Sequence, residues 1–180
     1  MESRTLRSHR VVGAIADDAP TCVSFYDLGG VGFVCARVAG DAFQVLKLDS
    51  LAVQLTSPRL GRPIACLASL GEWTYCGVGD ELWCFERAAF RGVAGAGAGA
   101  VRRLDVAGPL VVAAADAGET TELSCWARPA GATRSALPVD AARFELGAGF
   151  EMSAACHPPT YVNKIVVGSG AGALELWNLR

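Results

Sequence analysis

Short apolar runs of strand length, each followed by a turn signal, recur along this chain of 180 residues. Glycine, proline and acidic residues separate the runs, and no segment keeps a helical period of apolar residues over three turns. The turns are compact, and pairs such as Gly40-Asp41 and Gly79-Asp80 are typical of hairpins between neighbouring antiparallel strands. The sequence therefore predicts an all-β fold made of small antiparallel meanders.

The predicted strands group into four successive units. The first unit holds four strands, the second and third hold three each, and the fourth opens near Phe150 and ends, unfinished, at Trp177-Asn178. In chain order the predicted strands cover 21–26, 32–38, 42–48 and 51–56, then 64–68, 73–78 and 81–86, then 101–106, 110–115 and 122–127, and finally 164–167 and the strand that ends in Trp177-Asn178.

Tryptophan recurs in the last strand predicted for the second, third and fourth units. The spacing is 43 residues from Trp83 to Trp126 and 51 residues from Trp126 to Trp177, close to the roughly 40 to 45 residues of a WD repeat. We therefore predict a partial WD40-type β-propeller of about three and a half four-stranded antiparallel blades. A β-sandwich with ordinary core aromatics is the alternative, because the Gly-His dipeptide and the Asp of the full WD signature are absent.

The sheet of one repeat is too small to bury both of its faces alone, so neighbouring repeats must stack. We expect a tail and a lead-in strand over 1–20 and an incomplete propeller over 21–180, with a flexible Ala/Gly insert at 92–100. Ring closure usually takes more blades than these, and we interpret the chain as part of a larger propeller. Its unfinished sheet exposes an edge and an apolar face, so we expect the isolated chain to aggregate or to unfold with poor cooperativity.

Composition narrows the class of protein. Apolar residues make up 52% of the chain and the formal net charge is -2, which favours a packed core and argues against a basic RNA-binding domain. No apolar run is long enough to span a membrane, and Asp17-Asp18 interrupts the run that a signal peptide would need. Seven cysteines without a C-x-x-C pair favour reduced, buried thiols in a cytosolic or nuclear protein.

The glycine-rich run from Gly95 to Ala100 matches the pattern of a dinucleotide-binding fingerprint, and Asp116 follows about twenty residues later. A true fingerprint follows a buried parallel strand and opens a helix, whereas Arg87 to Arg91 precedes this run and only 100–108 remains for a helix. A dinucleotide-dependent enzyme would rest on this run alone. We favour a low-complexity loop between two blades.

Other groups that could carry chemistry are sparse. The chain has two histidines, and the side chains of adjacent Cys156 and His157 diverge in an extended segment, which argues against a thiolate–imidazolium pair. No cluster has standard metal-ligand spacing, and Asp116 with Glu119 lies in a turn-like polar context. We therefore expect a protein that is not an enzyme, with no catalytic residues, cofactor, metal or small-molecule substrate.

The segment 156–180 carries the most specific motif of the chain. It contains a buried strand at 164–167, a glycine turn at 168–172 and an alternating strand closed by Trp177-Asn178, with Asn where Asp is usual. We favour a structural role for His157 within the blade. We place Asn163-Lys164 at the exposed start of the strand, where the two residues could contact a partner. The motif residues are His157, Pro158, Thr160, Tyr161, Asn163, Lys164, Gly168, Trp177 and Asn178, beside the blade tryptophans Trp83 and Trp126.

The run from His157 to Arg180 resembles one family of eukaryotic nucleolar WD-repeat proteins, called U-three-protein twenty-one in yeast and WD-repeat protein thirty-six in animals. That family reads His-Pro-Ser-Thr-Tyr-Leu-Asn-Lys-Ile before the glycine turn, so Pro159 and Val162 are departures. Upstream, weaker similarity covers the N-terminal segment from Arg10, 47–51 and 81–87, whereas the Ala/Gly insert is not a feature of the family.

This resemblance implies a scaffold in the UtpB subcomplex of the small-subunit processome, in the nucleus and nucleolus, where pre-18S ribosomal RNA is processed and the small ribosomal subunit is made. The partners it implies are other processome proteins, with pre-rRNA and small nucleolar RNA contacted indirectly or locally, and no membrane. The alternative is a generic WD-repeat adaptor, for trafficking or as the substrate receptor of a ubiquitin ligase, which shares the fold but not the nucleolar location.

Overall fold

The computed structural model describes residues 19–25, 32–118, 120–128, 136–147, 149–158, 160–161 and 164–178. Within these ranges every regular element is a β-strand, and they hold no helix that could cross a membrane. The all-β prediction is confirmed. Most of the predicted tail and the motif residue Asn163 lie outside the described residues.

The strands form four antiparallel sheets, each a meander in chain order. The first sheet holds β1 (Thr21–Phe25), β2 (Phe33–Ala39), β3 (Ala42–Lys47) and β4 (Val53–Thr56). The second holds β5 (Cys66–Leu70), β6 (Trp73–Val78), β7 (Glu81–Glu86) and β8 (Ala89–Ala96). The third holds β9 (Val101–Ala107), β10 (Leu110–Ala117), β11 (Thr120–Ala127) and β12 (Val139–Glu145), and the fourth holds β13 (Met152–Cys156), β14 (Lys164–Ser169) and β15 (Leu174–Asn178).

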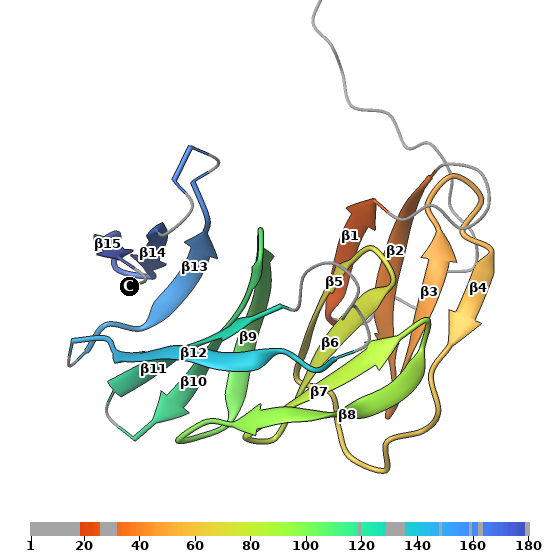
Figure 1. The fold of residues 1–180 in the computed structure, drawn as a ribbon, viewed down its shortest axis with the longest axis horizontal. Coiled ribbons are helices and arrows are strands. Elements are labelled where there is room, and N and C mark those ends of the chain that lie inside the picture. Colours follow the sequence, from red (N-terminus) through yellow and green to blue (C-terminus); the bar gives the residue numbers. More distant parts are fainter. Residues whose placement is uncertain are drawn as a thin grey trace, which may run out of the picture.

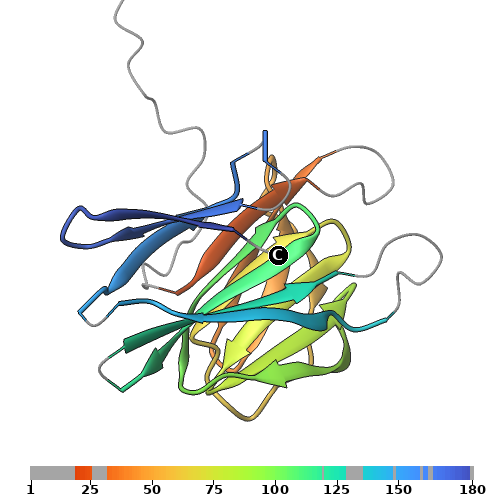
Figure 2. The ribbon, with the colours of Figure 1, turned by 60° about the vertical axis from the view of Figure 1, so that its left-hand side comes forward.

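Successive sheets stand side by side in a crescent, with the first and fourth sheets at its two ends (Figures 1 and 2). The first strand of each sheet faces the inside of the crescent, where β1 contacts β5, β5 contacts β9 and β9 contacts β13. The fourth strands β4, β8 and β12 lie toward the outside (Figure 1). This is the arrangement predicted for adjacent propeller blades.

Alternation of side chains along each strand supplies apolar residues to both faces of the middle sheets. In β6, Trp73 and Tyr75 face the third sheet, whereas Cys76 and Val78 face the first. Three apolar cores result in the described residues, one between each pair of neighbouring sheets. They centre on Ala36, Phe43, Val78 and Phe85 (first–second core), on Tyr75, Leu82, Val111 and Trp126 (second–third core), and on Leu123, Cys125, Ile165 and Val167 (third–fourth core).

The three repeat tryptophans occupy corresponding places in this architecture. Trp83 lies in β7, Trp126 in β11 and Trp177 in β15, which are the third strands of their sheets. Each packs into, or against, the core that its sheet shares with the preceding sheet. Trp83 and Trp177 follow Glu81 and Glu175 by two residues, whereas Trp126 follows Glu122 by four. The repeat spacing therefore reflects the same strand and the same side of each sheet rather than one identical position.

The prediction of a loop at 92–100 is wrong for its first part. Residues up to Ala96 continue β8, the fourth strand of the second sheet. The turn into β8 is Arg87-Ala88, with positive φ of 50° and 62°, a hairpin geometry in which Asn-Gly is usual. Small residues follow because other side chains pack over the strand. A Cβ on Gly95 would lie 2.9 Å from Nε1 of Trp126, and one on Gly99 would overlap the backbone oxygen of Asp116. Flexibility of this segment stays a prediction.

Substitution of Gly99 by alanine tests this close packing. We expect Gly99→Ala to lower the free energy of unfolding by about 1 to 3 kcal/mol, because the backbone of Asp116 must move to admit a methyl group. Gly170→Ala is the matched control, since a Cβ there meets nothing within 4 Å. Urea unfolding of the two variants checks this, and equal stability would contradict the packing.

Candidate protein-interaction rim

One rim of the crescent collects the loops that join first to second strands and the ends of the third strands. We call this the loop rim. The antiparallel registers place the Gly71-Glu72 turn, the Gly108-Pro109 turn and the loop after Cys156 on this same side of their sheets. In the second sheet, Arg87 donates from Nε to Oε1 of Glu72 at 2.8 Å, which ties the end of β7 to the neighbouring turn.

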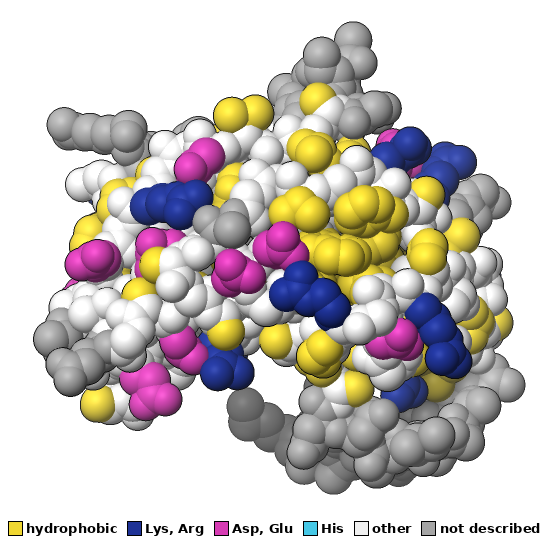
Figure 3. Space-filling view, turned by 90° about the horizontal axis from the view of Figure 1, so that it is seen from below, with side chains coloured by type: hydrophobic (Ala, Val, Ile, Leu, Met, Phe, Trp, Pro, Cys, Tyr) yellow, Lys and Arg dark blue, Asp and Glu magenta, His cyan; other side chains and the backbone are white. Residues whose placement is uncertain are grey.

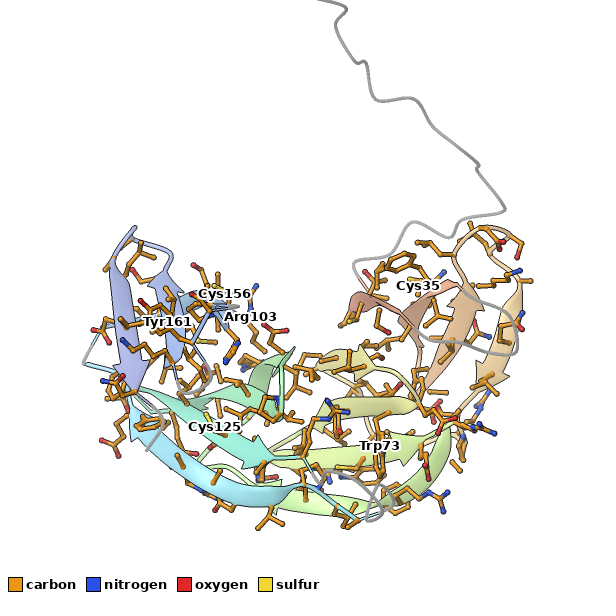
Figure 4. The ribbon with its side chains drawn as sticks, turned by 45° about the horizontal axis from the view of Figure 1, so that its top comes forward. Cys35, Trp73, Arg103, Cys125, Cys156 and Tyr161 are labelled. Carbon is orange, nitrogen blue, oxygen red and sulfur yellow. The ribbon has the colours of Figure 1, made fainter. Side chains whose placement is uncertain are left out.

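Most of the described motif residues gather where the fourth sheet meets the loop rim. Tyr161 donates its backbone N–H to the carbonyl of Pro158 at 3.1 Å, so His157, Pro158 and Thr160 lie in or beside one turn. Nζ of Lys164 lies 4.4 Å from the centroid of the exposed Tyr161 ring, a cation–π contact. Asn178 pairs with Lys164 across the sheet. Figure 4 shows Tyr161 at this end of the crescent.

Two motif residues lie elsewhere. Gly168 sits at the far end of β14, opposite Leu174 and next to the hairpin turn, so it is not part of the rim. Trp177 turns inward, where its ring centroid lies 5.1 Å from that of Phe144 in the third sheet. Trp177 therefore contributes to packing between the third and fourth sheets.

A partly buried contact that the sequence does not reveal joins neighbouring sheets at the loop rim. Arg128 donates from Nε to the Tyr75 hydroxyl in the second sheet and from Nη1 to the carbonyl of Gly108, both at 3.2 Å. On the other side of Gly108, a Cβ would lie 3.9 Å from Cε1 of His157, so the imidazole of the fourth sheet packs on this turn. Tyr75 and Arg128 are 53 residues apart and follow no repeat pattern.

A glutamate–leucine pair recurs in three third strands, at Glu81-Leu82, Glu122-Leu123 and Glu175-Leu176. Two residues after each glutamate a side chain donates to its carboxylate: Trp83 to Glu81 at 3.0 Å, Ser124 to Glu122 at 2.8 Å and Trp177 to Glu175 at 2.9 Å. Hydrogen bonds from Trp83 and Arg62 hold the pKa of the Glu81 carboxyl below its ordinary value. The recurring Glu-Leu dipeptide was the available signal.

The glycine-rich run does not form a phosphate cradle. Two of its amides are already paired, because Gly97 donates to the carbonyl of Asp80 at 2.7 Å and Ala98 donates to the Glu122 carboxylate at 3.2 Å. The run also leads into strand β9 rather than into a helix. These amides could donate to a bound pyrophosphate only if their present hydrogen bonds were broken.

The buried thiols are poor candidates for nucleophiles. Burial raises the pKa of Cys66, Cys84 and Cys125 to about 12, so these side chains stay protonated at neutral pH. Across the described ranges no three His, Cys, Asp or Glu side chains come together as a metal site. Cys156 pairs with Val166 on the outward face of the fourth sheet, whereas His157 packs toward Gly108.

One pocket lies at the loop rim, another lies at the opposite rim, and an apolar patch lies on the outer surface of the described residues. A pocket of 270 Å3 on the first sheet is lined mainly by Phe33, Leu48 and the stem of Lys47. One of 400 Å3 between the third and fourth sheets mixes Arg102 and Arg103 with Asp116 and Glu151. Viewed from below (Figure 3), apolar side chains gather beside charged ones, and β8, lowest in Figure 1, carries the half-exposed Phe90. Such surfaces suit protein contacts better than a small ligand.

No protein-family model matches the chain. Two curated proteins are similar over nearly all of it: U3 small nucleolar RNA-associated protein 21 homolog of Schizosaccharomyces pombe, 24% identical over 99% of this chain, and WD repeat-containing protein 36 of Homo sapiens, 26% identical over 95%. This chain spans about a fifth of their length, 19% and 18% respectively. The chain is a distant relative of these two proteins. Their similarity supports the family that the closing motif predicts.

Solved structures show the same fold at low identity. The chain superposes on the computationally designed Ika4 protein with a TM-score of 0.60, 12% identity and coverage of 98% of this chain and 100% of that one. For a chain of the Mitotic Checkpoint Complex the TM-score is 0.64, with 12% identity and coverage of 100% and 57%. The fold of this chain is thus a partial WD40-type β-propeller, with three four-stranded sheets and a described fourth sheet of three strands.

Removal of the Tyr75 hydroxyl tests the contact that joins the sheets. We expect Tyr75→Phe to lower the free energy of unfolding by about 0.5 to 1.5 kcal/mol, because Arg128 loses a buried acceptor. Tyr161→Phe is the matched control on the exposed rim and should stay within about 0.5 kcal/mol of the native chain. Thermal unfolding compares the two, and an equal loss in both would refute the contact's contribution.

The buried thiols also set a pH dependence. Their folded-state pKa is raised from 9.0 to about 12, so the stability that they contribute is fully present below pH 9.0 and is lost as the pH rises through about 12. We expect the free energy of unfolding in reducing buffer to fall across that window. The fall should be shallower in Cys84→Ala, measured by urea unfolding at each pH. The same slope in the variant and the native chain would speak against this origin.

Proposed function

We propose that this chain is a non-enzymatic scaffold segment of the small-subunit processome, in the UtpB subcomplex, which acts in pre-18S rRNA processing and small ribosomal subunit biogenesis in the nucleolus. The observation that carries the proposal is similarity over 99% and 95% of the chain to two WD-repeat relatives, one of which is named for association with U3 small nucleolar RNA. The closing motif, with His157, Tyr161 and Trp177, supports the same family.

The geometry supports a scaffold mechanism. Neighbouring sheets hold one another through buried apolar cores, so the loops of the rim are presented at fixed positions. The Tyr75–Arg128–Gly108 contact fixes the rim across the second and third sheets, and His157 extends it to the fourth. Because the loops of such a surface are already ordered, binding of a partner loses little conformational entropy. This property suits a scaffold that assembles other proteins.

The charges of the rim suit other proteins better than a long stretch of RNA. Arg87 is paired with Glu72, and Lys164 lies over Tyr161, which leaves mixed charge rather than a continuous basic stripe. The formal net charge of the chain is -2. Contact with pre-rRNA or small nucleolar RNA is therefore local or runs through partner proteins.

Immunoprecipitation of the tagged chain from its own cells tests the proposal. We expect recovery of other processome proteins together with pre-18S RNA and U3 small nucleolar RNA, and a nucleolar signal in fluorescence imaging. Lys164→Glu on the rim should reduce recovery, whereas Arg59→Glu, the same charge change on the exposed Arg59 beside the Asp41 turn, should not.

Two results would reject parts of this assignment. Absence of both processome proteins and these RNAs from the native precipitate, or a cytoplasmic location, rejects the processome role and favours the generic adaptor. Equal recovery with Lys164→Glu and Arg59→Glu rejects the loop rim as the contact surface.

A further inference from the structure

The outer side of the second sheet carries an apolar patch on strand β8. Its exposed members are Phe90 and Val93, which are 47% and 37% exposed. The β7–β8 register places them opposite Phe85 and Trp83, so both lie on the side of the sheet that faces the first sheet. Figure 3, seen from the side on which β8 lies, shows apolar side chains gathered together with basic side chains beside them. We call Phe90, Val93 and the partly buried Trp83 the β8 patch.

Two irregularities in the pairing of β7 with β8 shape this patch. Each leaves one residue of β8 without a partner in β7, first Arg91 and then Ala94. Phe90 and Val93 are three residues apart and would lie on opposite faces of a regular strand. The extra residue Arg91 brings both side chains to the same face, so the strand pairing itself directs them toward one place on the surface.

Two arginines stand at the two ends of the β8 patch. Arg62 pairs with Glu81, the first residue of β7, at 2.6 Å. Arg91 pairs with Glu86, the last residue of β7, also at 2.6 Å. Both arginine side chains are 45% exposed, whereas their carboxylate partners are 32% and 13% exposed, respectively. Each ion pair therefore presents its cation to solvent more than its anion. Trp83 donates to the same Glu81 oxygen as Arg62, which fixes this arginine beside the patch.

Each guanidinium keeps donors for a second carboxylate. In the described residues Arg62 donates only from Nη1 and Arg91 only from Nη2. An arginine carries five N–H donors in a planar fork and binds carboxylates well along its edges. A carboxylate of a partner can therefore join these ion pairs without displacing Glu81 or Glu86.

The spacing of the two arginines favours an extended ligand. Their partners Glu81 and Glu86 are five residues apart in one strand, which corresponds to about 16 Å at about 3.3 Å per residue. Two residues about five positions apart span that distance in an extended segment, whereas a helix needs about eleven residues. The outer edge of β8 runs alongside, and no described strand pairs with it, so it can hydrogen bond to the backbone of such a segment.

Strand β8 is also the least protected of the three fourth strands. Exposed edge strands usually are short or carry charges and proline, which discourage pairing with another chain. β4 has only four residues, and β12 carries Asp140, Arg143 and Glu145. The eight residues of β8 include one charged residue, Arg91, and no proline. An added strand therefore meets little that opposes it.

We propose that the β8 patch binds an extended segment of another protein. The segment places a large apolar side chain on Phe90 and Val93, and it places acidic side chains beside Arg62 and Arg91. The patch lies along the strands of the second sheet rather than at the loop rim. This binding surface goes beyond the proposed function and does not depend on it.

RNA fits this surface less well than an acidic segment of a protein. A carboxylate accompanies each of the two arginines and repels phosphate. The Phe90 ring also packs against Phe85 and Trp83, with centroids 5.5 Å and 5.1 Å away, so its faces are partly covered. Stacking of a base needs a free aromatic face.

Selection from a phage-displayed library of random twelve-residue peptides on the immobilised 180-residue chain tests the proposal. We expect the enriched peptides to carry a large apolar residue between two acidic residues about five positions apart. One enriched peptide, synthesised with a fluorescein label, then gives the dissociation constant by fluorescence anisotropy. Arg62→Glu, Arg91→Glu and Val93→Ser should each weaken its binding at least about tenfold.

Matched changes on the third sheet serve as controls. Arg143→Glu alters an arginine of 40% exposure on β12, and Val139→Ser alters a valine of 66% exposure on the same strand. Both should keep the native affinity. Lys164→Glu at the loop rim should keep it too, which separates this surface from the one in the proposed function. Circular dichroism and thermal unfolding check that every variant keeps the fold of the native chain.

Three results would each overturn the proposal. The first is a selection that enriches nothing, or that enriches peptides without acidic residues. The second is native affinity in the β8-patch variants, or an equal loss of affinity in the β12 controls. The third is binding of a fluorescein-labelled RNA of twelve uridines that Arg91→Glu abolishes, because this would assign the exposed arginines to RNA.

Discussion

Apolar packing between the faces of neighbouring sheets is the interaction on which the rest of this structure depends. The second and third sheets are apolar on both faces, because successive residues such as Tyr75 and Cys76 enter different cores. A small meander with one side in water would bury too little surface to be stable. Each sheet is therefore stable only when it packs against a neighbouring sheet. The first–second, second–third and third–fourth cores hold the crescent together.

The loop rim follows from this packing. The Gly71-Glu72 and Gly108-Pro109 turns are short and each is anchored by the sheet below, so contacts such as that between Arg128 and Tyr75 can cross from one sheet to the next. His157 adds the fourth sheet through the Gly108 turn. A scaffold gains affinity from such order, because binding does not have to pay for arranging the loops.

Much of the architecture could be predicted from local signals, and the exceptions have physical causes. The Gly40 and Gly79 turns, with positive φ, mark their hairpins clearly. Strand β8 was missed because Arg87-Ala88 adopts a turn geometry that its residue types do not indicate, and β12 because its half-exposed residues give little apolar pattern. The gathering of Tyr161 and Lys164 at one strand end was predictable from their spacing. The partnership of Tyr75 with Arg128 was not, because only the stacking of sheets brings them together.

Each of the three cores joins two sheets that follow one another directly in the chain. The formation of these cores therefore does not require a segment that is distant in the sequence. Trp126, for example, packs against the sheet that immediately precedes its own. During synthesis, each meander that leaves the ribosome therefore finds its support already made, and the nascent chain can fold by extension from its N-terminal end. The apolar face at the growing end is then covered as soon as the next meander forms, and this limits the time in which that face can misassociate.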